Sequence, residues 1–355
     1  MNEVKACSWQ VDLLEKMGFD VQTPYAQLET AYFAKSGKGK PIFCILAEYD
    51  ALPEMGHACG HNLICAAAIG AGKALADTLH KEKIPGTVIV MGTPAEEGKG
   101  GKVYLVRRKA FANIDAAIMA HPSSRTRIWR GFLSIIRFEV SFKGRSSHAS
   151  TAPEKGRNAL DAVMLFFQGI NAWRQHLPES SRIHGIVKSG GTAPNIVPDF
   201  ASCSFYIRAE NQAILEEMEK RFRDIAHGAA LMTGTTCEIK DGEEGYKSGK
   251  INKPLNDEYF KVAGELGMEP GASEKSGRAS SDFGDVSQVV PGTHVYFGIS
   301  PKENIPLHSA KFADAARSQH ALGAMLDASK ALAQIGYRFF TDFKFREEVK
   351  EDFKK

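Results

Sequence analysis

The chain has 355 residues, 43% of them hydrophobic and 25% charged, a composition that excludes a disordered or fibrous chain. Its length predicts two domains. The 45 basic and 42 acidic residues leave a formal net charge of +3, which is too small for the field that a dedicated nucleic-acid-binding protein needs. We therefore expect no nucleic-acid partner.

The same sequence predicts a cytoplasmic protein without a membrane partner. No run reaches the roughly 18 consecutive apolar residues that a membrane helix requires. The first residues, Met1 to Gln10, lack the apolar stretch of a secretion signal. None of the six cysteines shows C-x-x-C spacing, which favours reduced thiols over a disulfide framework.

The first third of the chain predicts strands that alternate with helices. In chain order we expect a helix over 5–18, strands over 30–35 and 41–47 around a turn at 36–40, a helix over 63–79, a buried strand over 86–93, a helix over 101–110 and a buried strand over 116–120. Alternation of this kind is typical of an α/β domain with a mostly parallel sheet.

The pattern changes near residue 131, where apolar and polar residues begin to alternate as in a strand with one solvent-exposed face. The expected elements are then a strand over 133–142, a helix over 159–174, strands over 183–188 and 201–209, a helix over 214–232 and a strand over 236–240. This β-α-β-β-α-β order is the ferredoxin-like arrangement.

After a charged linker over 241–253 the α/β pattern resumes, with a strand over 292–299 and one long helix over 313–335. The charged tail, 342–355, is expected to be a frayed helix end. We therefore predict a discontinuous α/β domain, residues 1–131 and 245–355, interrupted by an inserted four-stranded α+β domain, residues 132–244.

The densest cluster of reactive side chains is a loop that reads His-Ala-Cys-Gly-His between a buried strand and a helix. His57, Cys59 and His61 alternate along it, and thiolate and neutral imidazole groups on a fixed loop are typical metal ligands. Gly60 permits the tight backbone that such a loop needs. A lone cysteine or histidine is more often structural, but three alternating positions favour a metal site over a core cysteine between two surface histidines.

Two adjacent carboxylates, Glu96 and Glu97, follow the buried strand over 86–93. Ligands of parallel α/β sheets bind outside the carboxyl ends of the strands, so one carboxylate there can bind a metal ion while the other remains a general base. Alone, the pair could equally complement the dipole of a helix N-terminus. The glycines nearby do not fit the G-x-x-x-x-G-K-[ST] pattern of a P-loop.

Two further histidines stand after apolar strands. His121 follows the run 116–120, and His308 follows the strand over 292–299. Each histidine alone is more often structural. However, a Cys, His or Glu residue follows each of four predicted strands, and this pattern favours one site that these residues share.

This combination resembles the M20 family of metallopeptidases and amidohydrolases, in particular its M20D branch, which includes aminobenzoyl-glutamate utilisation proteins, Xaa-Arg-type dipeptidases and N-acyl amino acid amidohydrolases. The motifs that carry the resemblance span nearly the whole chain and are, in order, Asp50-Ala51-Leu52-Pro53, His57-Ala58-Cys59-Gly60-His61-Asn62, Pro94-Ala95-Glu96-Glu97-Gly98, Ala120-His121-Pro122, Gly144-Arg145-Ser146-Ser147-His148-Ala149, Pro194-Asn195-Ile196-Val197-Pro198-Asp199, Arg208-Ala209, Ser281-Asp282-Phe283 and Leu307-His308-Ser309.

The resemblance implies an α/β zinc-peptidase-like catalytic domain with an inserted ferredoxin-like lid and dimerisation domain, and hence a homodimer. It also implies two divalent metal ions, zinc or manganese. The implied ligands are Cys59 as the bridge, Glu97 and His308 for one ion, and His61 and His121 for the other.

Further roles follow from the same resemblance. Glu96 would be the general base, and His57 would support the ligand loop without binding metal. His148, Asn195 and Arg208 match family positions that contact substrate. His148 would help hold the developing oxyanion in the site of a partner subunit, and the Arg208 guanidinium suits a substrate carboxylate.

Two departures from the family pattern stand out. The chain begins at what resembles the end of the family's first helix, so we expect a short or missing N-terminal segment. The metal loop ends in Asn62, where many M20D members have Asp. This points away from the branch that hydrolyses indole-acetyl amides and hippurate, and toward a dipeptide, an N-acyl amino acid or an aminobenzoyl-glutamate-like substrate.

Other hydrolase classes fit the sequence less well. A zinc nucleobase deaminase needs H-x-E followed by P-C-x-x-C, and the sequence has the first element at His80-Lys81-Glu82 but no P-C-x-x-C. A serine hydrolase of the G-x-S-x-G type is excluded because that motif does not occur. A catalytically degenerate binding or scaffold protein of the same fold remains the alternative, but it would be expected to lack a ligand or the base.

Overall fold

The computed structural model describes residues 1–242, 245–271, 279–300 and 303–355. The chain divides into two compact units, one formed by Met1–Gly131 with Gly249–Lys355 and the other by Phe132–Ser248. The chain returns to the first unit at Gly249, whereas the sequence predicted this return at residue 245. Residues 243 and 244 of the predicted linker lie outside the described residues.

The first unit is built on one mixed sheet whose strand order is β1-β2-β4-β3-β5-β10. The strands are β1 (Asp20–Gln22), β2 (Tyr32–Lys38), β3 (Ile42–Ala47), β4 (Gly86–Gly92), β5 (Ala116–Ser123) and β10 (Gly292–Gly298). The pairs β4–β3, β3–β5 and β5–β10 are parallel, whereas β1–β2 and β2–β4 are antiparallel. The mostly parallel sheet is confirmed, and β4 and β5 are buried along their whole length, as strands covered on both faces must be.

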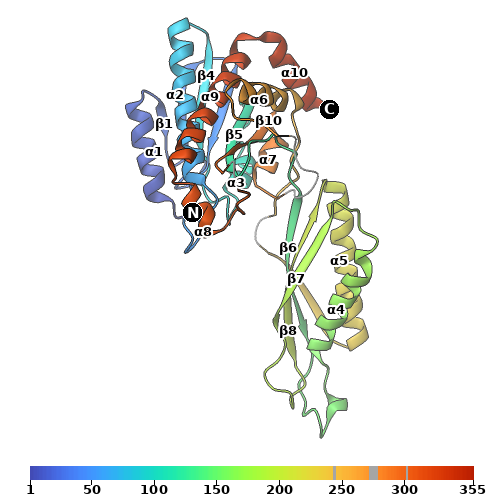
Figure 1. The fold of residues 1–355 in the computed structure, drawn as a ribbon. Helices are drawn as coiled ribbons and strands as arrows, with labels where there is room; N and C mark the ends of the chain where they lie inside the picture. Colours follow the sequence, from blue (N-terminus) through green and yellow to red (C-terminus); the bar gives the residue numbers. More distant parts are fainter. Residues whose placement is uncertain (243–244, 272–278, 301–302) are drawn as a thin grey trace. The chain divides into compact units, whose positions relative to one another are not determined.

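Helices flank this sheet (Figure 1). They are α1 (Val4–Lys16), α2 (His61–Glu82), α3 (Gly101–Arg107), α6 (Lys253–Glu265), α7 (Phe283–Ser287), α8 (Ala310–Ala315), α9 (Gln319–Thr341) and α10 (Phe343–Lys354). Helix α2 packs against α9 and against β3, β4 and β5. It is the one helix in the described ranges that is long and apolar enough to cross a membrane, and 56% of its apolar window is buried inside the protein.

In the C-terminal third, helices α6 and α7 were not predicted, and two predictions are wrong. The prediction of a single helix over 313–335 is wrong. Helix α8 ends at Ala315, and α9 begins as a separate helix after Ser318. The Ser318 side chain accepts the Ala321 N–H, which makes it a typical N-cap. The prediction of a frayed tail is also wrong, because α10 is a capped helix that buries Phe345 and Val349. Its apolar positions are four apart, so they lie on one face despite the high charge of the segment.

The second unit is a four-stranded antiparallel sheet in the order β7-β8-β6-β9, with two helices on one face (Figure 1). Its elements are β6 (Ser134–Lys143), α4 (Ala159–Arg174), β7 (Arg182–Ser189), β8 (Phe200–Ala209), α5 (Gln212–Thr233) and β9 (Thr236–Asp241). Both helices contact β6 and β8. Residues of β8 alternate between buried and more exposed, so one face of the sheet forms the core and the other does not. The ferredoxin-like order is confirmed.

Candidate metal centre

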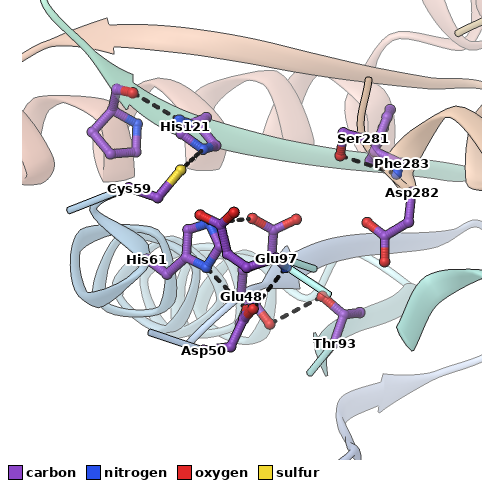
Figure 2. A network of polar contacts seen from close by, with 12 residues as sticks. Glu48, Asp50, Cys59, His61, Thr93, Glu97, His121, Ser281, Asp282 and Phe283 are labelled. Atoms are coloured by element: carbon purple, nitrogen blue, oxygen red, sulfur yellow. Dashed lines mark hydrogen bonds and ion pairs between the residues drawn. The ribbon is translucent and has the colours of Figure 1, made fainter. Parts of the chain in front are cut away.

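The predicted ligands of the first unit converge at one edge of its sheet. Asp50 follows β3, Glu96 and Glu97 follow β4, and His121 lies near the carboxyl end of β5. These strands are parallel, so their carboxyl ends meet at the same edge. Figure 2 shows the resulting cluster, with the Cys59 sulfur turned toward the His121 ring.

One group of donor atoms joins Cys59, His61 and His121, whose ligand atoms all lie within 4.8 Å of one another. The Cys59 Sγ and the His121 Nε2 are 3.5 Å apart. His121 donates its Nδ1 hydrogen to the Pro122 carbonyl at 2.7 Å, so the neutral ring presents the bare Nε2 to the cluster. All three residues are buried.

A second group joins Cys59, Glu97 and His308, again within 4.8 Å. The His308 Nε2 lies 3.2 Å from the Glu97 Oε1, and its side chain is 49% exposed, whereas that of Glu97 is 12% exposed. The Cys59 sulfur is therefore common to both groups. The structure brings together all five of the predicted ligands, in the two sets that the family resemblance implied.

Backbone geometry holds the loops of these groups close to each other. Gly60, which precedes α2, has a φ of +81°, and a Cβ atom there would lie 2.4 Å from the Pro122 side chain. Only glycine lets the cysteine loop approach β5 this closely. His308 has a φ of +59° and donates its backbone N–H to the Ala58 carbonyl at 2.9 Å. A non-glycine residue in this region is strained, and such strain is concentrated at functional sites.

Asp50 links the two donor groups. Its Oδ1 accepts the Nδ1 hydrogen of His61, and its Oδ2 accepts the backbone N–H of Glu97, both at 2.9 Å. Burial opposes the charge on Asp50, but these hydrogen bonds and the nearby positive charge lower its pKa to about 2. Ionised Asp50 therefore fixes the tautomer of His61 and turns its Nε2 toward the other donors, as carboxylates behind metal-binding histidines do.

A buried ion-pair network lies beside the cluster. The Lys102 ammonium donates to Glu48 and to Asp282, and all three side chains are at most 1% exposed. Burial opposes the charge on Lys102, but the charges of Asp282 and Glu48 outweigh it and raise its pKa. The second carboxylate oxygen of Glu48 lies 3.5 Å from the His61 Nε2.

Glu96 and His57 lie next to the donors. Glu96 is half-buried and forms a third group with His61 and Glu97. Burial, together with the charges of Glu48 and Asp282, raises the pKa of Glu96 well above its usual range. His57 is half-buried, and burial lowers its pKa. The residue that hydrogen-bonds to the His61 ring is Asp50. His57 lies at the other end of the ligand loop.

The donor set fits divalent metal ions. Two of its atoms, the His61 Nε2 and the Glu97 Oε1, are buried without a hydrogen-bond partner among the described residues, and buried polar atoms are rarely left unpaired. Burial raises the pKa of the Cys59 thiol, against the opposing effect of His61, so the thiolate needs a cation to stabilise it. Mixed thiolate, imidazole and carboxylate donors suit zinc and also other transition metals.

The three predicted substrate contacts belong to the second unit and do not lie together. His148 and Asn195 are on neighbouring loops, where the Ala149 N–H donates to the Asn195 carbonyl. Arg208 is near the end of β8, opposite Ile135 at the start of β6. The loop of His148 follows the far end of β6, so most of a ten-residue strand, about 25 Å at 3.3 Å per residue, separates Arg208 from the other two.

Sequence reasoning missed the parts that support the ligands. Asp50 and Asp282 stand in the motifs of the family resemblance, but nothing in them indicated their hydrogen bonds. Glu48 and Lys102 were missed altogether. The sequence does indicate that Glu48 needs a partner. It directly follows an apolar strand and would be buried, and a buried charge needs a partner. The sequence does not show which residue that partner is.

Comparison with known proteins identifies the family. The chain is 37% identical to the human Xaa-Arg dipeptidase over 369 aligned residues, which cover 99% of this chain and 81% of the relative. The chain belongs to the M20 family of metallopeptidases. A model of the M20 peptidase dimerisation domain matches residues 131–233. Another M20 relative, one of the p-aminobenzoyl-glutamate hydrolase subunits of Escherichia coli, is 35% identical over 281 residues, covering 74% of this chain and 58% of that one.

Solved structures of M20 proteins share the fold. A dinuclear metal-binding peptidase of the M20 family from Bacillus subtilis superposes with a TM-score of 0.72 at 21% identity, covering 94% of this chain and 93% of that one. An aminobenzoyl-glutamate utilisation protein from Klebsiella pneumoniae gives 0.68 at 20% identity, covering 96% and 92%. The α/β fold with an inserted dimerisation domain is thus that of the M20 family.

Replacing the shared sulfur should disrupt both donor groups. We expect the wild type to retain two tightly bound divalent ions per chain and Cys59→Ala to retain at most one, because alanine removes the atom common to both groups. Elemental analysis of protein dialysed after loading with zinc or manganese measures this ratio. Cys65→Ala is the matched control, since its sulfur donates to the Asn62 carbonyl and belongs to neither group. Unchanged metal content in Cys59→Ala would contradict a bridging cysteine.

Proposed function

We propose that this M20 protein is a metal-dependent hydrolase that cleaves the amide or peptide bond of a small substrate, with Glu96 as the general base. The observation that carries the proposal is the pair of donor groups that share Cys59, with the Glu96 carboxylate beside them. A catalytically degenerate member of the family would be expected to lack one of these groups, and none is missing.

The proposed ligands are Cys59 for both ions, Glu97 and His308 for one, and His61 and His121 for the other, as the two donor groups suggest. Zinc and manganese are both compatible with these donors. When bound, a pair of divalent ions lowers the pKa of a coordinated water and polarises the scissile carbonyl. Asp50 keeps His61 in the tautomer that a ligand needs.

Glu96 would move the proton. Its carboxylate would accept a proton from the attacking water and later deliver it to the nitrogen of the leaving amine. Burial and the charges of Glu48 and Asp282 raise its pKa, which favours a carboxylate able to take up a proton near neutral pH. Glu97, the adjacent residue, has its backbone N–H fixed by Asp50, so the two glutamates can keep separate roles.

The named relatives suggest the substrate class. An Xaa-Arg dipeptide and p-aminobenzoyl-glutamate both have an amide bond next to an amino acid with a free α-carboxylate, and proteins named for them are 37% and 35% identical to this chain. We propose a dipeptide, an N-acyl amino acid or an aminobenzoyl-glutamate-like substrate. We further propose a cytoplasmic location, with which the six free cysteines agree.

We also propose that the enzyme is a homodimer through its second unit and that His148 acts on substrate in the partner's site. Strand β7 is an edge strand with the exposed apolar residues Ile186 and Val187, which is suited to pairing with another copy. His148 and Arg208 lie at opposite ends of the sheet. If both contact one small substrate, they must come from different chains.

The two glutamates should respond differently to the same isosteric change. Glu96→Gln is expected to retain both metal ions and to lower kcat by about 10²–10⁴-fold, the usual contribution of a general base. Glu97→Gln is expected to weaken metal binding, because it removes a ligand charge. Steady-state kinetics on a dipeptide and metal titration by calorimetry separate the two outcomes. Metal loss in Glu96→Gln with full retention in Glu97→Gln would reverse the assigned roles.

Subunit mixing tests the role of His148 in the partner's site. Homodimers of His148→Ala and of Glu96→Gln should each be inactive or nearly so. After subunit exchange, each mixed dimer has one site with both groups intact, so activity should return to about a quarter of the wild-type value for random exchange of equal amounts. Exchange is followed by native mass spectrometry. Background activity despite proven exchange would show that His148 does not act across the interface.

A further inference from the structure

Ser150 is a residue of the second unit that the proposed mechanism does not use, and it contacts the His148 ring. The His148 Nδ1 lies 3.3 Å from the backbone nitrogen of Ser150 and 3.2 Å from its hydroxyl oxygen. Within the described parts of the chain, the His148 ring forms hydrogen bonds with Ser150 alone. Because His148 is otherwise exposed, Ser150 is the residue of this unit that orients its ring.

The backbone around His148 explains why the two residues meet. His148 forms an antiparallel bridge with Ile196 of the neighbouring loop, which fixes the position of its Cα atom. The chain then turns back on itself, and the Ala152 N–H donates to the His148 carbonyl at 3.1 Å. This turn brings the N–H of Ser150 against the ring of the residue two positions before it, a local contact that polar side chains often make with the backbone.

The backbone contact determines which nitrogen of the ring carries the hydrogen. A backbone N–H can only donate, so the Nδ1 of His148 is the acceptor. In a neutral imidazole the other nitrogen then carries the hydrogen. The hydroxyl of Ser150 can donate to the same Nδ1. His148 is thereby presented as a donor through its Nε2, whereas the other tautomer would present a lone pair there.

A developing oxyanion needs a donor of this polarity. The carbonyl oxygen of an amide gains negative charge as water attacks, and a donor that is already in place stabilises this charge without having to reorient. A lone pair at the Nε2 position would repel it. An exposed imidazole without a partner at Nδ1 would exchange between its two tautomers, so that only a fraction of the molecules would be competent.

We propose that Ser150 is a positioning residue, which holds His148 in the tautomer that donates its Nε2 hydrogen to the oxyanion of the substrate. This inference rests on the proposed function, because it concerns the histidine that we place in the partner's site. Ser150 acts through His148 and not on the substrate itself. The competing hypothesis is that Ser150 only closes a turn and has no effect on the reaction.

Removing the hydroxyl tests this contact in the metal-loaded dimer. Ser150→Ala should lower kcat on a dipeptide by about 3- to 10-fold, the effect of one neutral hydrogen bond. It should leave KM unchanged, because the oxyanion exists only in the transition state. Ser150→Thr keeps the hydroxyl and should restore most of kcat. Thr151→Ala removes an exposed hydroxyl of the same turn, and as the matched control it should change neither constant.

Subunit mixing places the change on one chain at a time. In a mixed dimer of His148→Ala and Glu96→Gln chains, the intact site uses the His148 of the Glu96→Gln chain. Adding Ser150→Ala to that chain should lower the recovered activity by the same factor. Adding it to the His148→Ala chain should have no effect, whereas a general loss of dimer stability would lower the activity in both arrangements.

Nitrogen NMR of protein with isotope-labelled histidine detects the tautomer without turnover. The signals that disappear in His148→Ala are those of His148. At mildly alkaline pH, where imidazole is neutral, the wild-type ring should carry its hydrogen on Nε2 and none on Nδ1. Ser150→Ala should show a larger share of the other tautomer, and Thr151→Ala should match the wild type.

The outcomes separate this inference from the proposed function. A hydrogen on Nδ1 in the wild type contradicts the inference, as does a kcat of Ser150→Ala equal to that of Thr151→Ala. A loss of activity on whichever chain carries Ser150→Ala shows a structural role, which also contradicts it. Should Ser150→Ala fail to fold, Ser150→Gly removes the same hydroxyl. If the metal-loaded wild type hydrolyses no dipeptide, N-acyl amino acid or aminobenzoyl-glutamate, the proposed function fails and the inference fails with it.

Discussion

One carboxylate holds the two halves of the candidate metal centre in register. Asp50 accepts a hydrogen bond from the His61 ring with one oxygen and from the backbone of Glu97 with the other. It thereby couples the start of α2 to the loop after β4, and each of these segments supplies a donor to a different group around Cys59. Both the tautomer of His61 and the separate roles that we propose for the two adjacent glutamates depend on this shared acceptor.

Charge compensation is the second requirement of the site. Glu48, Asp282 and Lys102 are all buried within the same region (Figure 2 labels the two acids). Removing one partner of a buried ion pair typically costs about 3–5 kcal/mol, because the other charge is left without compensation. The single ammonium thus compensates two acidic side chains, one of which, Glu48, reaches to 3.5 Å from the His61 Nε2. Asp282 also connects its own segment to the start of α3, because its Oδ2 accepts the backbone N–H of Lys102 at 2.9 Å.

Much of this could be predicted from the sequence, for physical reasons that also account for the failures. The strand ends and the side chains that converge there were predictable. Short apolar runs indicate buried strands, and a Cys, His or Glu residue directly after them lies at the edge of the sheet where ligands bind. Helix α10 was not predictable, since its charged surface hides an apolar face of only Phe345 and Val349. The break between α8 and α9 depends on a local cap at Ser318 that competes with a continuous helical pattern. The partners of buried charges, such as Lys102, are set by tertiary contacts alone.

The central claim is that Cys59 bridges two metal ions. Anomalous diffraction from crystals of the metal-loaded protein, collected on both sides of the zinc or manganese absorption edge, tests it most directly. A bridging cysteine predicts two peaks, each within about 2.3 Å of the Cys59 sulfur for zinc, one of them next to His61 and His121 and the other next to Glu97 and His308. A single peak, or two peaks of which only one is bound by Cys59, would contradict it.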